Sequence, residues 1–246
     1  MRLLLHLFAV VVLTIVTQLG GIAWLIACGF KARLRVFLVA YLVLWGAAIG
    51  AAPFFGRVPL HCWQPGPLQM QSWVYCLLNR NYVTPEMADV LRDAAGALDR
   101  RAAGTTTLVL DGSFPFFDGF PLLPHLSHDD GEKADLAFFY RDETGYLPGV
   151  TRSPIGYFAF EPGPTECGDV WPTLRWNLEP LQPLWADYAL DEDRLRAVLE
   201  ILADDPRVGK ILLEPHLKTR LSLSSDKIRF QGCRAARHDD HIHLQL

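Results

Sequence analysis

The chain has 246 residues, 50% of them hydrophobic, and a formal net charge of −4 at pH 7. A chain of this length forms one large domain or a smaller domain with an accessory segment. The slightly acidic balance, without basic clusters among aromatic residues, argues against a nucleic-acid-binding protein.

Two long uncharged segments open the chain. Residues 3–30 and residues 36–56 contain no Lys, Arg, Asp or Glu. Both reach the roughly 20 apolar residues that cross a bilayer, and the first exceeds the roughly 7–15 apolar residues of a signal peptide. A cleaved signal or a buried helical hairpin are the alternatives for residues 3–30. We expect a membrane anchor of two transmembrane helices over residues 1–56, followed by a separate domain over residues 57–246.

The basic residues predict the orientation of this anchor. The short connection "KARLR" (residues 31–35) carries three positive charges, whereas the outer ends carry Arg2 and Arg57 alone. Because cytoplasmic connections are enriched in Lys and Arg, the connection is expected inside. The N-terminus and everything after Gly56 are then expected outside.

The cysteines give an independent indication of the compartment. Beyond Cys28, the chain has Cys62, Cys76, Cys167 and Cys233, with no CxxC pair that would suggest a zinc knuckle. Four cysteines in an exported domain suit two disulfides, whereas in a reducing cytosol they would bind metal or stay free. Three pairings are open; proximity favours Cys62 with Cys76, which leaves Cys167 with Cys233.

Helices and strands are mixed in the rest of the chain. Thr84 is a suitable N-cap for a helix that ends near Ala102, and Asp191 caps a second amphipathic helix over 191–205. Apolar runs predict strands over 105–112, 133–140, 209–213, 227–232 and 240–246, and residues 145–169 are rich in Gly and Pro. Without regular βαβ alternation, we expect an α+β fold, an antiparallel sheet with flanking helices.

The last predicted strand carries two histidines on one face. Side chains alternate along a strand, so His241 and His243 share a face and Ile242 and Leu244 share the other. If the apolar face of this strand packs on the core, the opposite face presents two imidazoles, which is an arrangement suited to a metal cleft.

A second motif lies upstream in "SHDDGEKAD". On one continuous helix, His128 and Asp135 would lie about 10 Å apart along the axis, too far to share one ion. A turn at Asp130 and Gly131 can instead bring them together at the start of a strand. Two imidazoles and one carboxylate leave the fourth position of a tetrahedral zinc open, which is typical of a catalytic site.

The two motifs resemble those of a known family. "HLSHDDGEKAD" is similar to the HxxGxxxD signature, and "HDDHIHLQL" to the C-terminal HxH signature, of the penicillin-insensitive murein endopeptidases. These are zinc peptidases related to D-Ala-D-Ala carboxypeptidases and dipeptidases. The segment "VGKILLEPHLKTRL" is also similar, and the resemblance covers Leu108 to Leu246.

The resemblance implies a function and a set of site residues. His128, Asp135 and His243 would bind Zn²⁺, and His241 would polarise or deprotonate the attacking water. His238 would flank it as a further catalytic histidine, and His125 would contact substrate. The substrate would be the peptide cross-links of bacterial peptidoglycan, cut on the periplasmic side of the inner membrane.

Several alternatives stay open. Related D-Ala-D-Ala peptidases use a Glu as base where this chain has Asp240, whose strand parity places it off the face of His241 and His243. His125 could be structural. The product could be that of a carboxypeptidase or dipeptidase, or the domain could bind zinc or peptidoglycan without catalysis. A serine mechanism at Ser224 and Lys227 is not expected, because the companion motifs of SxxK enzymes are missing.

Overall fold

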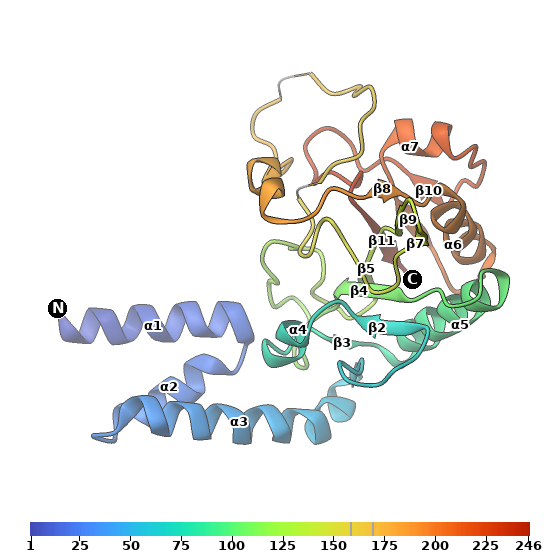
Figure 1. The fold of residues 1–246 in the computed structure, drawn as a ribbon. Coiled ribbons are helices and arrows are strands. Elements are labelled where there is room, and N and C mark those ends of the chain that lie inside the picture. Colours follow the sequence, from blue (N-terminus) through green and yellow to red (C-terminus); the bar gives the residue numbers. More distant parts are fainter. Residues whose placement is uncertain (158, 169) are drawn as a thin grey trace.

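The computed structural model describes residues 1–246 except residues 158 and 169. Figure 1 shows N-terminal helices that extend to one side of a domain of mixed helices and strands. The helical elements are α1 (Arg2–Thr17), α2 (Gly20–Cys28), α3 (Arg33–Ala51), η1 (Ala52–Phe55), α4 (Trp73–Leu77), α5 (Pro85–Arg101), η2 (Glu179–Leu184), α6 (Glu192–Asp204) and α7 (Pro215–Arg220), where η1 and η2 are 3₁₀ turns. The strands are β1 (Val58–Pro59), β2 (Leu68–Met70), β3 (Tyr82–Val83), β4 (Thr107–Asp111), β5 (Lys133–Ala137), β6 (Tyr140–Asp142), β7 (Gly145–Tyr146), β8 (Ala189–Leu190), β9 (Lys210–Leu212), β10 (Ile228–Arg229) and β11 (His241–Gln245).

The main sheet is mixed, so the expectation of an antiparallel sheet is only partly correct. Its six strands follow the order β10-β9-β11-β5-β4-β2. The pairs β9–β11, β11–β5 and β5–β4 are antiparallel, but β10 runs parallel to β9 and β2 parallel to β4. A helix lies in the connection of each parallel pair, α7 between β9 and β10 and α5 between β2 and β4. Such a crossover returns the chain in its original direction.

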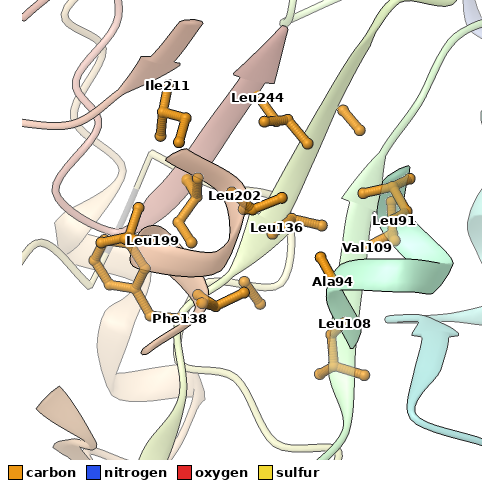
Figure 2. Close-up of a cluster of buried hydrophobic side chains, with 14 of the residues drawn as sticks. Leu91, Ala94, Leu108, Val109, Leu136, Phe138, Leu199, Leu202, Ile211 and Leu244 are labelled. Carbon is orange, nitrogen blue, oxygen red and sulfur yellow. The ribbon is translucent and has the colours of Figure 1, made fainter. Parts of the chain in front are cut away.

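Two helices cover one face of this sheet and form the core with it. Figure 2 shows Leu91 and Ala94 of α5 and Leu199 and Leu202 of α6 gathered with strand residues such as Leu244. Burying a Leu or Ile side chain of this kind contributes about 1.5–3 kcal/mol. Both helices begin as the sequence predicts, because the Thr84 side chain accepts a hydrogen bond from the Met87 amide and the Asp191 side chain accepts one from the Arg194 amide.

The last strand alternates as the sequence predicts. Ile242 and Leu244 are fully buried in the core formed with α5 and α6. His241 and His243 therefore project from the opposite face of the sheet.

The N-terminal segment contradicts the expectation of two transmembrane helices. Residues 3–30 break at Gln18, whose φ is 63°, into α1 of 16 residues and α2 of 9 residues. Among the described residues, only Arg33–Phe55, with 23 residues, is a helix long and apolar enough to cross a membrane. The break has a packing reason, since a Cβ atom on Gly21 would collide with Thr14 of α1, and glycine alone lets α2 lie this close.

The N-terminus also lies elsewhere than expected. His6 of α1 lies 3.3 Å from Arg33 at the start of α3, while Gln18 at the other end of α1 contacts the domain. Figure 1 accordingly shows the N-terminus and the start of α3 at the end away from the domain. The N-terminus and the basic connection thus share one end, and the domain lies at the other.

The cysteines pair as proximity favours. Cys62 is bonded to Cys76 and Cys167 to Cys233, with Cα–Cα distances of 6.3 and 5.3 Å. The second disulfide joins the long segment before η2 to the segment that leads into β11. Cys28 of α2 is a free thiol.

Candidate metal centre

Strand pairing places the key carboxylate in the middle of the sheet. Asp135 of β5 is paired with His243 of β11 on one side and with Asp111 of β4 on the other. All three residues are buried. The acidic group therefore lies where two neighbouring strands can present further side chains to it.

The loop before β5 supplies two more imidazoles. Gly131 reverses the chain with a φ of 76°, and a Cβ there would collide with the Arg57 side chain, so a glycine is required. The His128 ring is held by the Gly112 carbonyl, 2.9 Å from its Nδ1 atom. A neutral His128 therefore carries its proton on Nδ1 and turns the Nε2 lone pair toward Asp135.

Three donor atoms converge at this point. His128 Nε2 and His243 Nδ1 are 3.1 Å apart, and they lie 3.2 and 2.8 Å from Asp135 Oδ1. Ligands around one tetrahedral ion with bonds of 2.0–2.2 Å are separated by about 3.3–3.6 Å. The observed separations are a few tenths of an ångström shorter, so small side-chain shifts would let His128, Asp135 and His243 share an ion.

His125 overlaps with this set. Its Nδ1 atom contacts Asp135 Oδ2, and the buried group of His125, His128 and Asp135 could hold a metal ion. The structure thus places His125 beside the carboxylate, and His125 also lines the cleft described below. His125 and His243 approach the two different oxygens of one carboxylate.

The charges in the centre are strongly coupled. Burial alone would raise the pKa of Asp135, but the surrounding imidazoles, His128 and His125 foremost, hold it well below its usual range. Burial together with the neighbouring imidazoles lowers the pKa of His243 to about 4, although Asp135 acts in the opposite direction. An ionised carboxylate beside a neutral imidazole is the donor state that a cation needs.

His241 lies beside these donors and is held by its neighbour. The Asp240 side chain is fully buried, with Oδ1 2.5 Å from His241 Nδ1 and Oδ2 accepting a hydrogen bond of 2.6 Å from Ser153. The other ring nitrogen, Nε2, lies 3.9 Å from Asp135 Oδ2. Burial alone would lower the pKa of His241, but Asp240 and Asp135 raise it to about 9.

His238 completes the histidine cluster. Its ring centroid lies 5.1 Å from that of His241 and 5.5 Å from that of His243. Burial and then the neighbouring imidazoles hold its pKa well below the usual value. His238 is therefore a neutral imidazole on the wall of the centre.

A small cleft opens onto the donors. Its cavity has a volume of about 160 Å³, and its lining includes Tyr157, Leu174, Trp176 and Gln231. The Tyr157 ring lies 5.1 Å from His125 and 5.8 Å from Trp176. These rings give the polar centre an apolar rim.

Sequence reasoning missed several of these residues. Tyr157 and Ser153 lie in the stretch assigned only as a Gly- and Pro-rich loop, and no spacing connects either one with the histidine motifs. Arg80, which is ion-paired with Asp111 beside His125, was also missed. The sequence offered one indication of this part of the site, Asp111, because it is a carboxylate at the end of an apolar strand.

No protein-family model matches this chain, and no curated protein does. The description of the site therefore depends on the geometry given above. That geometry brings all the histidines of both motifs to one cleft with Asp135, and it places Asp239 apart from them in an ion pair with Arg237.

Proposed function

We propose that the chain is a membrane-anchored zinc metallopeptidase that hydrolyses peptide cross-links of bacterial peptidoglycan. The observation that carries the proposal is the meeting of His128, Asp135 and His243, whose donor atoms lie within 3.2 Å of one another at the base of a cleft. Two imidazoles and one carboxylate leave a coordination position for water, as in catalytic zinc sites.

The metal would supply a water of lowered pKa and a Lewis acid for the scissile carbonyl. No protein nucleophile is then required. In this scheme Gly112 fixes His128 through its Nδ1 proton. The side-chain amide of Gln245, 3.1 Å from His243 Nε2, fixes His243 when its oxygen faces the ring.

His241 is assigned as the base in this proposal. Asp240 occupies its Nδ1 atom, so Nε2 is the nitrogen that faces the cleft and moves a proton. A cation beside Asp135 would offset that carboxylate and lower the pKa of His241 toward neutrality, where a base operates best. Asp240 is a positioning residue in this assignment, because the ring of His241 already takes up one of its oxygens.

The choice of substrate rests on the likeness of the two histidine motifs to those of murein endopeptidases. The two disulfides and the N-terminal apolar helices support an extracytoplasmic domain, which is where peptidoglycan lies. A carboxypeptidase acting on D-Ala-D-Ala termini would use the same donors. The two activities differ in their products alone.

The test is digestion of purified muropeptides by the full chain in detergent. We expect cross-linked dimers to become monomers, a chelator to abolish the reaction, and added zinc to restore it. Mass spectrometry of the products distinguishes this from loss of terminal D-Ala on monomers, which would show a carboxypeptidase. Cleavage that persists after complete removal of metal would exclude the mechanism.

A further inference from the structure

A second pocket lies beside the metal cleft. Its cavity has a volume of about 460 Å³, which is within the range of roughly 300–1,000 Å³ typical of sites for small ligands. Its lining includes Trp171, Thr173, Arg175, Asn177, Cys233 and Arg237. None of these six residues belongs to the metal centre, so the pocket is separate from the metal donors.

The pocket and the cleft share a thin wall. Leu174 and Trp176 line the metal cleft. Thr173 and Arg175, which alternate with them along the same segment, line the pocket. The Leu174 amide donates a hydrogen bond of 2.8 Å to the Arg234 carbonyl, which joins this segment to the one that leads into β11. Because alternate residues of an extended segment face opposite sides, one polymeric ligand can contact both cavities.

The walls of the pocket are held together covalently. The disulfide between Cys167 and Cys233 joins two of its lining residues, with a Cα–Cα distance of 5.3 Å. The Thr173 hydroxyl donates a hydrogen bond of 3.3 Å to the Cys233 carbonyl across the same wall. A pocket fixed in this way loses little conformational entropy when a ligand binds.

Two arginines bring hydrogen-bond donors to the pocket. Arg175 donates hydrogen bonds of 3.1 and 3.0 Å to Glu214, which is 2% exposed. Arg237 binds the equally buried Asp239 through Nε and Nη2, and its guanidinium carbon lies 3.6 Å from the centre of the Phe160 ring. Among the described residues, these bonds take up two of the five N–H groups of each arginine, so further donors are available to a ligand.

The charges of the pocket favour a neutral ligand. In the part of its lining that the structure describes, Arg175 and Arg237 are the charged residues. The carboxylates of Glu214 and Asp239 offset both charges at hydrogen-bond distance. An anion gains little from guanidinium groups that are already paired, whereas hydroxyl and amide oxygens accept hydrogen bonds from them without bringing a charge.

Trp171 adds an apolar surface next to these donors. Its side chain lines the pocket and is 87% exposed. The flat face of an indole packs against the C–H face of a pyranose ring, while the hydroxyl and acetamido groups at the edge of the sugar need hydrogen-bond partners. An exposed indole beside fixed neutralised donors therefore matches both parts of a sugar.

We propose that this pocket binds an N-acetylated amino sugar of the glycan strand, while the attached peptide lies in the metal cleft. The identity of the polymer rests on the proposed function, and the preference for a neutral carbohydrate rests on the pocket itself. Trp171 stacks on the sugar ring in this arrangement, and Arg175 and Arg237 donate to its oxygens. The glycan thereby positions the peptide beside the metal centre.

The test measures binding of chitotetraose, a β-1,4-linked tetramer of N-acetylglucosamine, by isothermal titration calorimetry. The full chain is used in a detergent without a sugar headgroup. We expect Trp171→Ala to weaken binding about tenfold or more, because aromatic anchors carry much of the energy of such contacts. Trp171→Tyr keeps an aromatic face and should retain most of the affinity. The matched control is Trp73→Ala, whose indole is 57% exposed outside the pocket, and it should bind as the parent does.

Absence of chitotetraose binding, or equal binding by Trp171→Ala and Trp73→Ala, would overturn the sugar site. A stem peptide without sugar whose binding depends on Trp171, while chitotetraose does not bind, would overturn it in favour of a peptide site. Chitotetraose contains no peptide cross-link, so its binding does not depend on the proposed reaction. Sugar binding without cleavage of muropeptides would keep the site and remove the peptidase, and cleavage without sugar binding would do the reverse.

Discussion

Asp135 is the residue on which the centre depends, because four imidazoles lower its pKa against the effect of burial. Removing the carboxylate would leave those rings without the charge that organises them. The histidines around Asp135 have different contacts: His243 Nδ1 lies 2.8 Å from Asp135 Oδ1, whereas His241 Nδ1 lies against Asp240. Variants of His241 and His243 should therefore differ in their effects on catalysis and on metal binding.

At the residue scale, replacing the proposed base should impair chemistry but spare the metal. We expect His241→Ala to lower the rate of dimer cleavage by about 10²–10⁴-fold, the usual contribution of a general base. The zinc content should be unchanged, because the donors His128, Asp135 and His243 remain. Cleavage at the wild-type rate would remove His241 from the mechanism.

The carboxylate behind His241 should matter less than the ring itself. Asp240→Asn keeps the shape of the side chain but weakens its hold on His241 Nδ1, so we expect a loss of about 10–100-fold in kcat. The exposed Asp226→Asn serves as the matched control and should leave kcat unchanged. If Asp240→Asn abolished activity as completely as His241→Ala, Asp240 would itself be the base.

At the scale of elements, the sequence predicts those parts whose causes are local. α5 and α6 have N-cap side chains and one apolar face, and the alternation of β11 separates Ile242 and Leu244 from the two histidines. The meeting of His128 with Asp135 likewise follows from a turn at Gly131. The patterns that specify these features lie within a few residues.

Other elements depend on contacts between distant segments. At the break between α1 and α2, the Gln18 side chain binds Phe116, which lies 98 residues away in the sequence. A hydropathy pattern cannot predict such a contact. The parallel strand β10 pairs over two residues, too few for a pattern. Ser153 and Tyr157 reach the site from a loop whose path no periodicity describes.

The contact of Gln18 gives a prediction at this scale. Gln18→Ala leaves the amide and carbonyl of the half-buried Phe116 without their partners, and the cost should not exceed the roughly 1–3 kcal/mol of an unpaired buried group. Thermal unfolding in detergent should therefore occur at a lower temperature, while the exposed Gln64→Ala should leave it unchanged. An unaltered unfolding temperature for Gln18→Ala would mean that the contact between Gln18 and Phe116 does not stabilise the fold.

At the scale of the whole molecule, the two disulfides should contribute differently to the free energy of unfolding. The bond between Cys167 and Cys233 closes 66 residues of chain and that between Cys62 and Cys76 closes 14. Chain entropy then gives about 4 and about 3 kcal/mol. Denaturant unfolding of the paired Cys→Ser variants should show a larger loss for 167 and 233, and equal stability of both variants and the parent would contradict this.

At the scale of the whole molecule, the basic residues of the N-terminal helices lie at one end and the candidate centre lies at the other. Arg2 and Arg33 lie at the end of the helices away from the domain, which agrees with the cytoplasmic preference of positive charge better than an external N-terminus does (Figure 1). In the proposed orientation, the cleft would lie outside the cell membrane, in a compartment where disulfides form.

The most direct test of the metal centre is the zinc content of purified variants, because two overlapping donor sets share His128 and Asp135. We predict one zinc per chain in the wild type and in His125→Ala, and none in His243→Ala. Full zinc in His243→Ala with loss in His125→Ala would assign the ion to His125, His128 and Asp135. That result would contradict the proposed centre.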